Sequence, residues 1–209
     1  MLHIADFAIG PLETNCYVVY NDTEAVAVDP GGPPHPVLDF LQQKKLKLMH
    51  ILLTHLHFDH TYGVSELVKA TGATVLASED DRYMLETEPG KGGVWSLPLV
   101  TPYDYTGLPE GALPLLGSSC IVLATPGHTP GGLSFYFPDA QAVFSGDSLF
   151  HSSIGRTDFP RGDTNTLLQS IRSKIFTLPE ETRVYPGHSG QTSVGEEKRN
   201  NPFVGAFAR

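Results

Sequence analysis

The densest group of side chains able to bind a metal lies in residues 54–60, which read Thr-His-Leu-His-Phe-Asp-His. Three imidazoles and one carboxylate within a few residues are ligands that Zn²⁺ and Fe²⁺ accept. The packing of a core gives no reason for so many adjacent titratable groups, so an ordinary polar loop with satisfied histidines explains the segment less well. The pattern predicts a metal site formed by His55, His57, Asp59 and His60.

Three later segments place a potential ligand directly after a predicted strand. They are Pro126-Gly127-His128, Gly146-Asp147 and Pro186-Gly187-His188. In each segment a glycine precedes the ligand, where the backbone can turn sharply or come close to a metal. One Gly-His pair alone would be weak support, but three such segments downstream of the dense cluster indicate a shared site.

The elements that must position these residues can be predicted from the apolar pattern. Residues 48–53 form a continuous apolar run, typical of a strand buried on both faces. A loop leaving that strand can direct His55 and His57 to one point, and a helix starting near Asp59 and His60 can present a second pair. Further strands are predicted over 2–9, 16–20, 25–28, 74–77, 120–124, 133–137, 142–144 and 183–185.

Apolar residues at helical spacing predict helices over 37–46, 64–68 and 167–175, and Asp163 is placed to cap the last one. Strands precede helices in each half of the chain. The expected architecture is therefore a layered α/β (α+β) domain in which helices cover two sheets. The length of 209 residues fits one domain spanning residues 1–209.

Residues 91–119 break the pattern, because prolines and glycines are dense there and exclude a long helix or a central strand. Trp95, Tyr103 and Tyr105 lie within this segment. A long irregular loop in a compact domain is often functional, so we expect either a substrate lid or a surface insertion held by its aromatic side chains.

Composition narrows the classes of partner. Lys and Arg total 14 against 23 Asp and Glu, a net charge of −9, which argues against a nucleic-acid partner. Two cysteines cannot form a disulfide framework or a four-cysteine zinc site. No apolar run is long enough to span a membrane, and the first 20 residues lack a secretory pattern. We therefore expect a cytoplasmic location and no membrane partner.

The order T-H-x-H-x-D-H, followed by His, Asp and His, resembles the metallo-β-lactamase superfamily. The resemblance extends from Thr14-Asn15-Cys16-Tyr17 and Val28-Asp29-Pro30-Gly31-Gly32 to Asn201-Pro202-Phe203. It implies a four-layer αββα sandwich with a two-metal site at one edge. By position it assigns to the first metal His55, His57, His128 and Asp147. To the second metal it assigns Asp59, His60, His188 and the same Asp147, which would bridge the two ions.

A nitrogen and oxygen ligand set can leave coordination positions to water, as catalytic rather than structural zinc sites do. Two ions about 3.5–4 Å apart can share a hydroxide that attacks a carbonyl. Asp59 is then expected to orient this metal-bridging hydroxide or to accept its proton. The expected cofactors are two divalent metal ions per chain, zinc first, with iron and manganese as alternatives.

Residues 155–163, G-R-T-D-F-P-R-G-D, are similar to the hydroxyacylglutathione hydrolase (glyoxalase II) branch in its short bacterial form. The resemblance implies hydrolysis of a thioester such as S-D-lactoylglutathione to D-lactate and glutathione. One alternative is a persulfide dioxygenase, which would use a single iron at His55, His128 and Asp147. The others are a lactonase or another small-ester hydrolase and, outside enzymology, a metal-binding scaffold module. Each enzyme reading implies a small-molecule substrate.

Five residues outside the ligand set are candidates for substrate contact or loop support. We expect Arg156 and Asp158 to form a buried ion pair that braces the loop beside Asp147; the alternative is substrate contact by Arg156. His151 is a candidate to support Asp147, with an exposed loop position as the alternative. The remaining two are the tyrosines of the predicted lid, Tyr103 and Tyr105.

Overall fold

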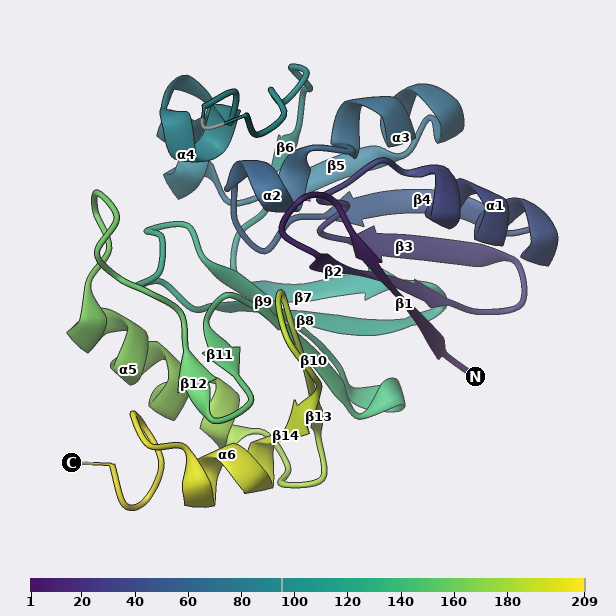
Figure 1. Cartoon of the computed structure of the whole chain (residues 1–209). Coiled ribbons are helices and arrows are strands. Elements are labelled where there is room, and N and C mark those ends of the chain that lie inside the picture. The colour runs from purple at the N-terminus through teal and green to yellow at the C-terminus, as the bar shows by residue number, and fades with distance from the viewer. Residues whose placement is uncertain (95, 209) are drawn as a thin grey trace. The chain divides into compact units, whose positions relative to one another are not determined.

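The computed structural model describes residues 1–94 and 96–208, so Trp95 of the predicted lid lies outside the described residues. The chain divides into two compact units, which are described separately (Figure 1). Unit 1 holds residues 1–108 and 115–118, and unit 2 holds residues 109–114 and the chain from residue 119 onward. Each unit contains one six-stranded sheet.

The sheet of unit 1 has the order β1-β2-β3-β4-β5-β6. Its strands are β1 (His3–Ile9), β2 (Thr14–Tyr20), β3 (Glu24–Val28), β4 (Lys47–Leu52), β5 (Thr74–Ala77) and β6 (Thr106–Gly107). The first three strands pair antiparallel and the last four pair parallel. The side chain of Asn21 closes the β2–β3 turn by accepting from Thr23 N (2.9 Å) and Glu24 N (2.8 Å). The predicted strands of this half are confirmed to within two residues at each end.

Two helices cover the sheet of unit 1: α1 (His35–Lys44) and α3 (Val64–Thr71). Their apolar residues, including Val37, Leu41 and Leu67, are buried in one core with strand residues such as Ile51 and Ala27. Unit 1 also contains the short helices α2 (Phe58–Thr61) and α4 (Glu88–Lys91) and the 3₁₀ helix η1 (Glu79–Glu86).

The sheet of unit 2 has the order β14-β13-β10-β9-β8-β7. Its strands are β7 (Gly111–Leu115), β8 (Ser118–Ala124), β9 (Leu133–Phe137), β10 (Ala142–Gly146), β13 (Arg183–Pro186) and β14 (Thr192–Ser193). Strands β10 and β13 run parallel. A separate short hairpin joins β11 (Leu149–Phe150) to β12 (Ser153–Ile154).

The helices of unit 2 are α5 (Thr164–Ser173) and α6 (Val194–Asn200), with short 3₁₀ turns η2 (Pro138–Ala140) and η3 (Ile175–Thr177). Asp163 caps α5 as predicted, because its Oδ1 accepts from Thr166 N at 2.7 Å. Buried Leu167 and Ile171 of α5 pack in one core with sheet residues such as Val143 and Val184.

The second half of the segment 91–119 is more regular than predicted. It contains β6, β7 and the start of β8. Both β6 and β7 are edge strands of their sheets. Pro114 lies in β7, and an edge strand can accommodate a proline because one of its sides has no neighbouring strand to bond. The proline-rich sequence excludes a central strand but is compatible with an edge strand, so the prediction of an irregular loop is wrong for residues 106–107, 111–115 and 118–119.

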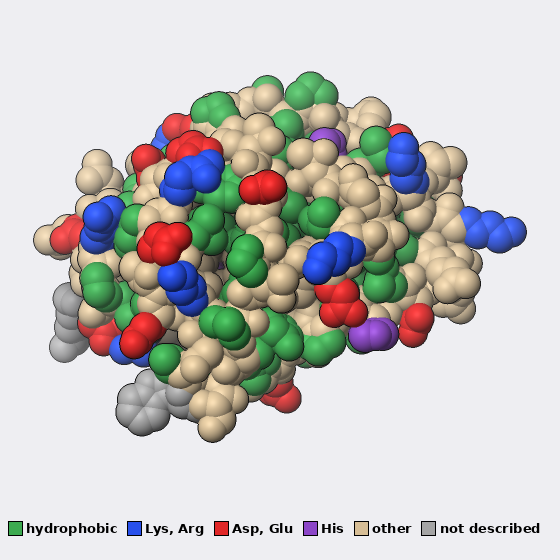
Figure 2. All heavy atoms as spheres, turned by 90° about the horizontal axis from the view of Figure 1, so that it is seen from above, with side chains coloured by type: hydrophobic (Ala, Val, Ile, Leu, Met, Phe, Trp, Pro, Cys, Tyr) green, Lys and Arg blue, Asp and Glu red, His purple; other side chains and the backbone are tan. Residues whose placement is uncertain are grey.

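Among the described residues, no helix combines the length and the apolar character that crossing a bilayer requires. On the face shown in Figure 2, basic and acidic side chains lie interspersed, with hydrophobic side chains between them. Unit 1 also carries exposed ion pairs, such as Arg82 with Glu79 and Lys91 with Glu86.

Candidate metal centre

The first cluster consists of His55, His57, Asp59 and His60 in unit 1, and it follows the buried end of β4 as predicted. All four side chains are nearly or fully buried. The Nε2 atom of His55 and the Nδ1 atom of His57 face each other at 2.9 Å, and His60 Nε2 lies 3.7 Å from Asp59 Oδ2. Buried imidazole and carboxylate groups at such distances are suited to hold a cation.

The loop 29–32 lies directly against this cluster. A Cβ atom on Gly31 would lie 1.6 Å from the carbonyl oxygen of Asp59, so no larger residue fits at this position. Gly63, which follows α2, is similarly close to the carbonyl oxygens of Gly32 and Pro30. These glycines let the loop after β3 and the helix α2 pack backbone against backbone, which fixes the position of Asp59 and His60.

Asp29 is a functional residue to which the sequence analysis gave no role. Its carboxylate is 2% exposed and accepts from Thr54 N (2.8 Å), Thr54 Oγ1 (2.6 Å) and His60 Nδ1 (2.9 Å). Because Thr54 donates its only hydroxyl proton to Asp29, its oxygen accepts from His55 Nδ1 at 3.1 Å. Asp29 therefore holds His60 directly and His55 through Thr54, and both rings keep Nε2 as the basic nitrogen.

The second cluster consists of His128, Asp147 and His188 in unit 2. Asp147 follows β10 and His188 follows β13, and these parallel neighbours end side by side, with Gly187 N donating to Gly146 O at 2.9 Å. The Oδ2 atom of Asp147 lies 3.7 Å from His128 Nε2 and 3.8 Å from His188 Nε2. The topology of this sheet thus brings together three residues that are up to 60 positions apart.

A backbone carbonyl orients the ring of His128. Its Nδ1 donates to Arg156 O at 2.6 Å, so Nε2 is the basic nitrogen on the side of Asp147. Gly155 makes this arrangement possible, since a Cβ there would lie 1.8 Å from Asp147 O and 3.3 Å from His128 Nδ1. Ring N–H groups held by a carboxylate or a carbonyl are typical of histidine ligands to metals.

Helix α6 supports the segment that contains Gly155. The buried carboxylate of Glu197 accepts from Thr192 Oγ1 (2.7 Å), Ser152 N (3.0 Å) and Asn201 Nδ2 (2.8 Å). Asn201 Nδ2 also donates to Ser153 O at 3.0 Å. These bonds fix the β11–β12 hairpin, which leads directly into Gly155 and the carbonyl that holds His128.

The predicted buried ion pair of Arg156 and Asp158 is wrong in one respect. The pair forms, with N–O distances of 2.6 and 2.7 Å, but its side chains are 60% and 67% exposed. Arg156 lies over the ring of Phe159 at 4.3 Å, and its hydrogen bond lowers the pKa of Asp158 to about 2. The two residues lie in a loop that turns toward solvent, and the backbone of Arg156, not its side chain, supports a candidate ligand.

The remaining candidates are His151, Tyr105 and Tyr103. His151 is exposed and lines a surface hollow with Arg183 and Gln191. Tyr105 donates to Ser78 O at 3.3 Å and carries the Arg82 guanidinium on its ring at 4.5 Å. Tyr103 is partly buried and lines a cavity in unit 1, considered below.

The donor set of both clusters fits divalent metal ions. It offers imidazole nitrogen and carboxylate oxygen, which suit zinc, iron and manganese. In each cluster a buried acceptor already fixes a ring N–H and leaves the other nitrogen as the ligand atom. The two clusters therefore have the support that metal ligands need.

Residues 9–188 match the family described as the metallo-beta-lactamase superfamily. Over 208 residues the chain is 35% identical to the hydroxyacylglutathione hydrolase GloC of Haemophilus influenzae, covering 97% of this chain and 98% of that protein. The crystal structure of the BLEG-1 B3 metallo-beta-lactamase is 39% identical, has a TM-score of 0.90, and covers 97% of this chain and 99% of that one.

A second solved structure, TTHA1623 in a di-iron-bound form, is 39% identical with a TM-score of 0.86, and it covers 96% of this chain and 100% of that chain. These matches confirm the predicted fold class. Since the family match contains all seven candidate ligands, the clusters imply that this chain binds divalent metal ions. The chain belongs to the metallo-β-lactamase superfamily of metal-dependent proteins, whose fold it shares.

Proposed function

We propose that the chain is a thioester hydrolase that uses two divalent metal ions. His55, His57 and His128 would hold the first ion, Asp59, His60 and His188 the second, and Asp147 would contact both. The observation that carries this proposal is the pair of orienting contacts, Asp29 on His60 and the Arg156 carbonyl on His128. A core that only needed packing would not bury carboxylates and imidazoles in this arrangement.

When bound, two such ions would lower the pKa of a water molecule and polarise a carbonyl oxygen. The chain's own residues perform the remaining tasks. Asp29, Thr54 and the Arg156 carbonyl hold the imidazole rings in one tautomer. Asp59, which is 7% exposed beside His60, would orient the nucleophile or accept a proton during the reaction.

Two features support a thioester as the substrate. Residues 155–163 are similar to the hydroxyacylglutathione hydrolase branch, and the chain is 35% identical to a protein named for that activity. S-D-lactoylglutathione is therefore the first substrate to test, with D-lactate and glutathione as products. A small-molecule substrate, zinc as the preferred metal and a cytoplasmic location belong to the same proposal.

A second candidate is the hydrolysis of β-lactams, favoured by the 39% identity to a protein described as a B3 metallo-beta-lactamase. It would use the same ligands on a strained amide. The two candidates differ only in the substrate that the walls of the site accept, so one panel of assays separates them.

The test is a metal analysis of the purified chain, followed by assays with S-D-lactoylglutathione, a chromogenic cephalosporin and a glutathione persulfide. Two metals per chain and loss of the thioester, abolished by Asp147→Asn, would support the proposal. Hydrolysis of the cephalosporin alone would favour the second candidate. One iron per chain with persulfide-dependent oxygen uptake would refute the proposal in favour of a dioxygenase.

A further inference from the structure

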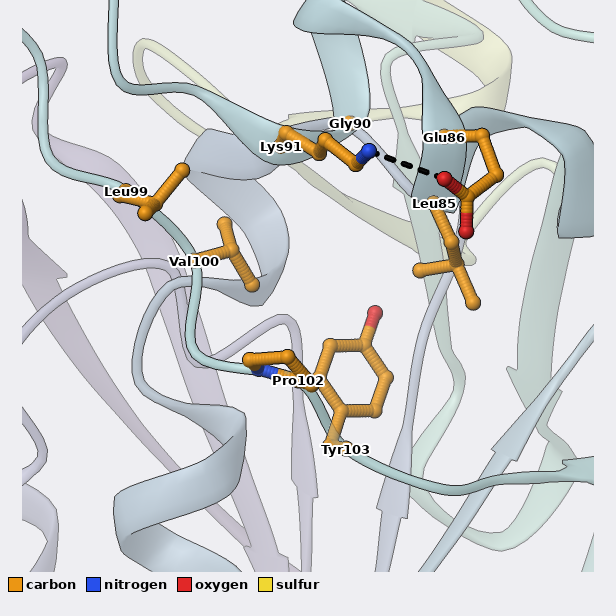
Figure 3. Close-up of a pocket in the computed structure, with 8 residues that line it drawn as sticks. All are labelled: Leu85, Glu86, Gly90, Lys91, Leu99, Val100, Pro102 and Tyr103. Atoms are coloured by element: carbon orange, nitrogen blue, oxygen red, sulfur yellow. Dashed lines mark hydrogen bonds and ion pairs between the residues drawn. The ribbon is translucent and has the colours of Figure 1, made fainter.

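Unit 1 contains a cavity of about 500 Å³ that the sequence analysis did not predict (Figure 3). Its walls come from the end of η1, from α4 and from the segment that follows α4. They are formed by Leu85, Glu86, Gly90, Lys91, Leu99, Val100, Pro102 and Tyr103. This volume lies within the range of about 300–1,000 Å³ that small-molecule sites occupy, and most of the wall is apolar, as in such sites.

The cavity wall packs against the segment that carries the first cluster. A Cβ atom on Gly90 would lie 3.1 Å from the carbonyl oxygen of Leu56, the residue between His55 and His57. A Cβ on the nearby Gly92 would lie 3.2 Å from the Phe58 ring in α2. The wall of the cavity therefore packs against the segment that carries the candidate ligands within the same unit.

Two polar features distinguish this cavity from a packing defect. The hydroxyl of Tyr103 points into it in Figure 3. This oxygen is buried, and no group among the described residues forms a well-aligned hydrogen bond with it; the neighbouring Thr61 hydroxyl donates to His57 O at 3.2 Å. At the rim, Lys91 Nζ pairs with Glu86 Oε2 at 2.9 Å (Figure 3).

A buried hydroxyl with no partner costs about 1–3 kcal/mol of unfolding free energy. Among the described residues, the hydroxyl of Tyr103 has only the poorly aligned Thr61 hydroxyl beside it, so a well-placed ligand oxygen would recover part of that cost. The walls around this hydroxyl, Leu85, Val100 and Pro102, carry no polar side chain. The two charged lining residues, Lys91 and Glu86, are exposed at the rim and pair with each other. The chemistry of the cavity therefore matches an apolar chain with a single oxygen.

We propose that this cavity binds the acyl group of the substrate, and that this group is an apolar chain, larger than lactoyl, with one oxygen that accepts from Tyr103. The proposal rests on the proposed function, because it treats the chain as a thioester hydrolase. It assigns substrate preference to Val100 and Tyr103, which are specificity residues outside the metal ligand set.

The experiment uses the metal-loaded chain and N-acetylcysteamine thioesters with lactoyl, acetyl, butanoyl, hexanoyl, octanoyl and 5-oxohexanoyl groups. The hydrolysis rates give kcat/KM for each group. The matching ketones, in which a methylene replaces the sulfur, cannot be hydrolysed, so calorimetry gives their dissociation constants without turnover. We expect affinity to rise about three- to fourfold per added methylene until the cavity is full.

Three variants locate the effect. Val100→Trp narrows the cavity and should end the rise in affinity at a shorter acyl group than in the wild type. Tyr103→Phe should weaken binding of the 5-oxohexanoyl ketone about fivefold, the value of one hydrogen bond, without weakening the hexanoyl ketone. Tyr20→Phe, which removes a tyrosine hydroxyl on β2 away from the cavity, is the matched control and should keep the wild-type series.

The outcomes separate the two proposals. Hydrolysis of all thioesters with no dependence on chain length, or a preference for lactoyl, would refute the cavity assignment and leave the thioester hydrolase in place. Ketone binding that depends on acyl length, with a series that Val100→Trp cuts short, but without hydrolysis of any thioester, would support the cavity and refute the proposed function. If Val100→Trp leaves the dependence of affinity on acyl length unchanged, the acyl group does not bind in this cavity.

Discussion

Replacing Asp29 with asparagine tests the support of the first cluster. The Asp29 backbone has a positive φ of 50°, which asparagine tolerates better than most residues. The side chain keeps its shape, so the exchange removes only the charge and one acceptor. We expect Asp29→Asn to lower the metal affinity of the chain about 10- to 100-fold, the usual effect of losing an outer partner of a histidine ligand.

The magnitude follows from the three donors that Asp29 accepts. Oδ2 accepts from Thr54 Oγ1 and His60 Nδ1, and Oδ1 accepts from Thr54 N. An asparagine retains one oxygen, so in either orientation at least one buried donor faces an NH₂ group. A buried donor without an acceptor costs about 1–3 kcal/mol, so we also expect the metal-free variant to lose that much unfolding free energy.

The assay is competition for zinc between the chain and a chromophoric chelator, together with guanidinium unfolding of the metal-free protein. Asp39→Asn is the matched control, because Asp39 is exposed on α1 of the same unit and should change neither quantity. Wild-type zinc affinity in Asp29→Asn, with the fold intact, would show that Asp29 does not support the ligands and would refute this reasoning.

Glu197→Ala should lower the free energy of unfolding by about 3 kcal/mol, because three hydrogen-bond donors lose the carboxylate that accepts from them. A loss well below about 1 kcal/mol in guanidinium unfolding would contradict this. Asp158 should titrate at about pH 2 by NMR, below its usual value of about 3.9, and return to that value in Arg156→Met. Because its folded-state pKa is lowered, its contribution to stability is present above about pH 4 and lost as the pH falls toward 2. Burial raises the pKa values of the Cys16 and Cys120 thiols, the latter to about 12. Neither thiol should therefore react with Ellman's reagent until the chain is unfolded. Rapid labelling of the native chain would argue against that burial.

The candidate ligands could be predicted from the sequence because the residue types and spacings that mark them lie within short segments. The cluster of His55, His57, Asp59 and His60 is dense enough to stand out from any core or loop. His128, Asp147 and His188 each follow a short apolar strand. The strands themselves were predictable for the same reason, since apolar periodicity acts over a few neighbouring residues.

The supporting residues could not be predicted, because their contacts join distant parts of the chain. Asp29 meets Thr54 and His60 across 25 and 31 positions, and Glu197 meets Ser152 across 45. A single Asp or Glu in a sequence does not indicate burial. The available signals were the Val28-Asp29-Pro30-Gly31-Gly32 run at the end of a strand and the Asn201-Pro202-Phe203 run after α6, and neither specifies a partner.

The solvent exposure of individual side chains also could not be predicted from the sequence. The pairing of Arg156 with Asp158 follows from their spacing, but whether a loop turns toward solvent depends on packing elsewhere. The cavity beside Tyr103 is a similar case, because it results from how η1, α4 and the residues after α4 fold against α2. Side-chain types predict which groups can interact, and tertiary packing decides which of them meet water.

The cavity also bears on how this chain could diverge. Every described residue that lines it lies between Leu85 and Tyr103, in the single connection from β5 to β6. The candidate metal ligands lie in other segments. If the cavity binds the acyl group as proposed, substrate preference and metal binding are encoded by separate stretches of the gene. Exchanging one short segment with that of a relative would then change the preferred acyl group while every candidate ligand stays in its place.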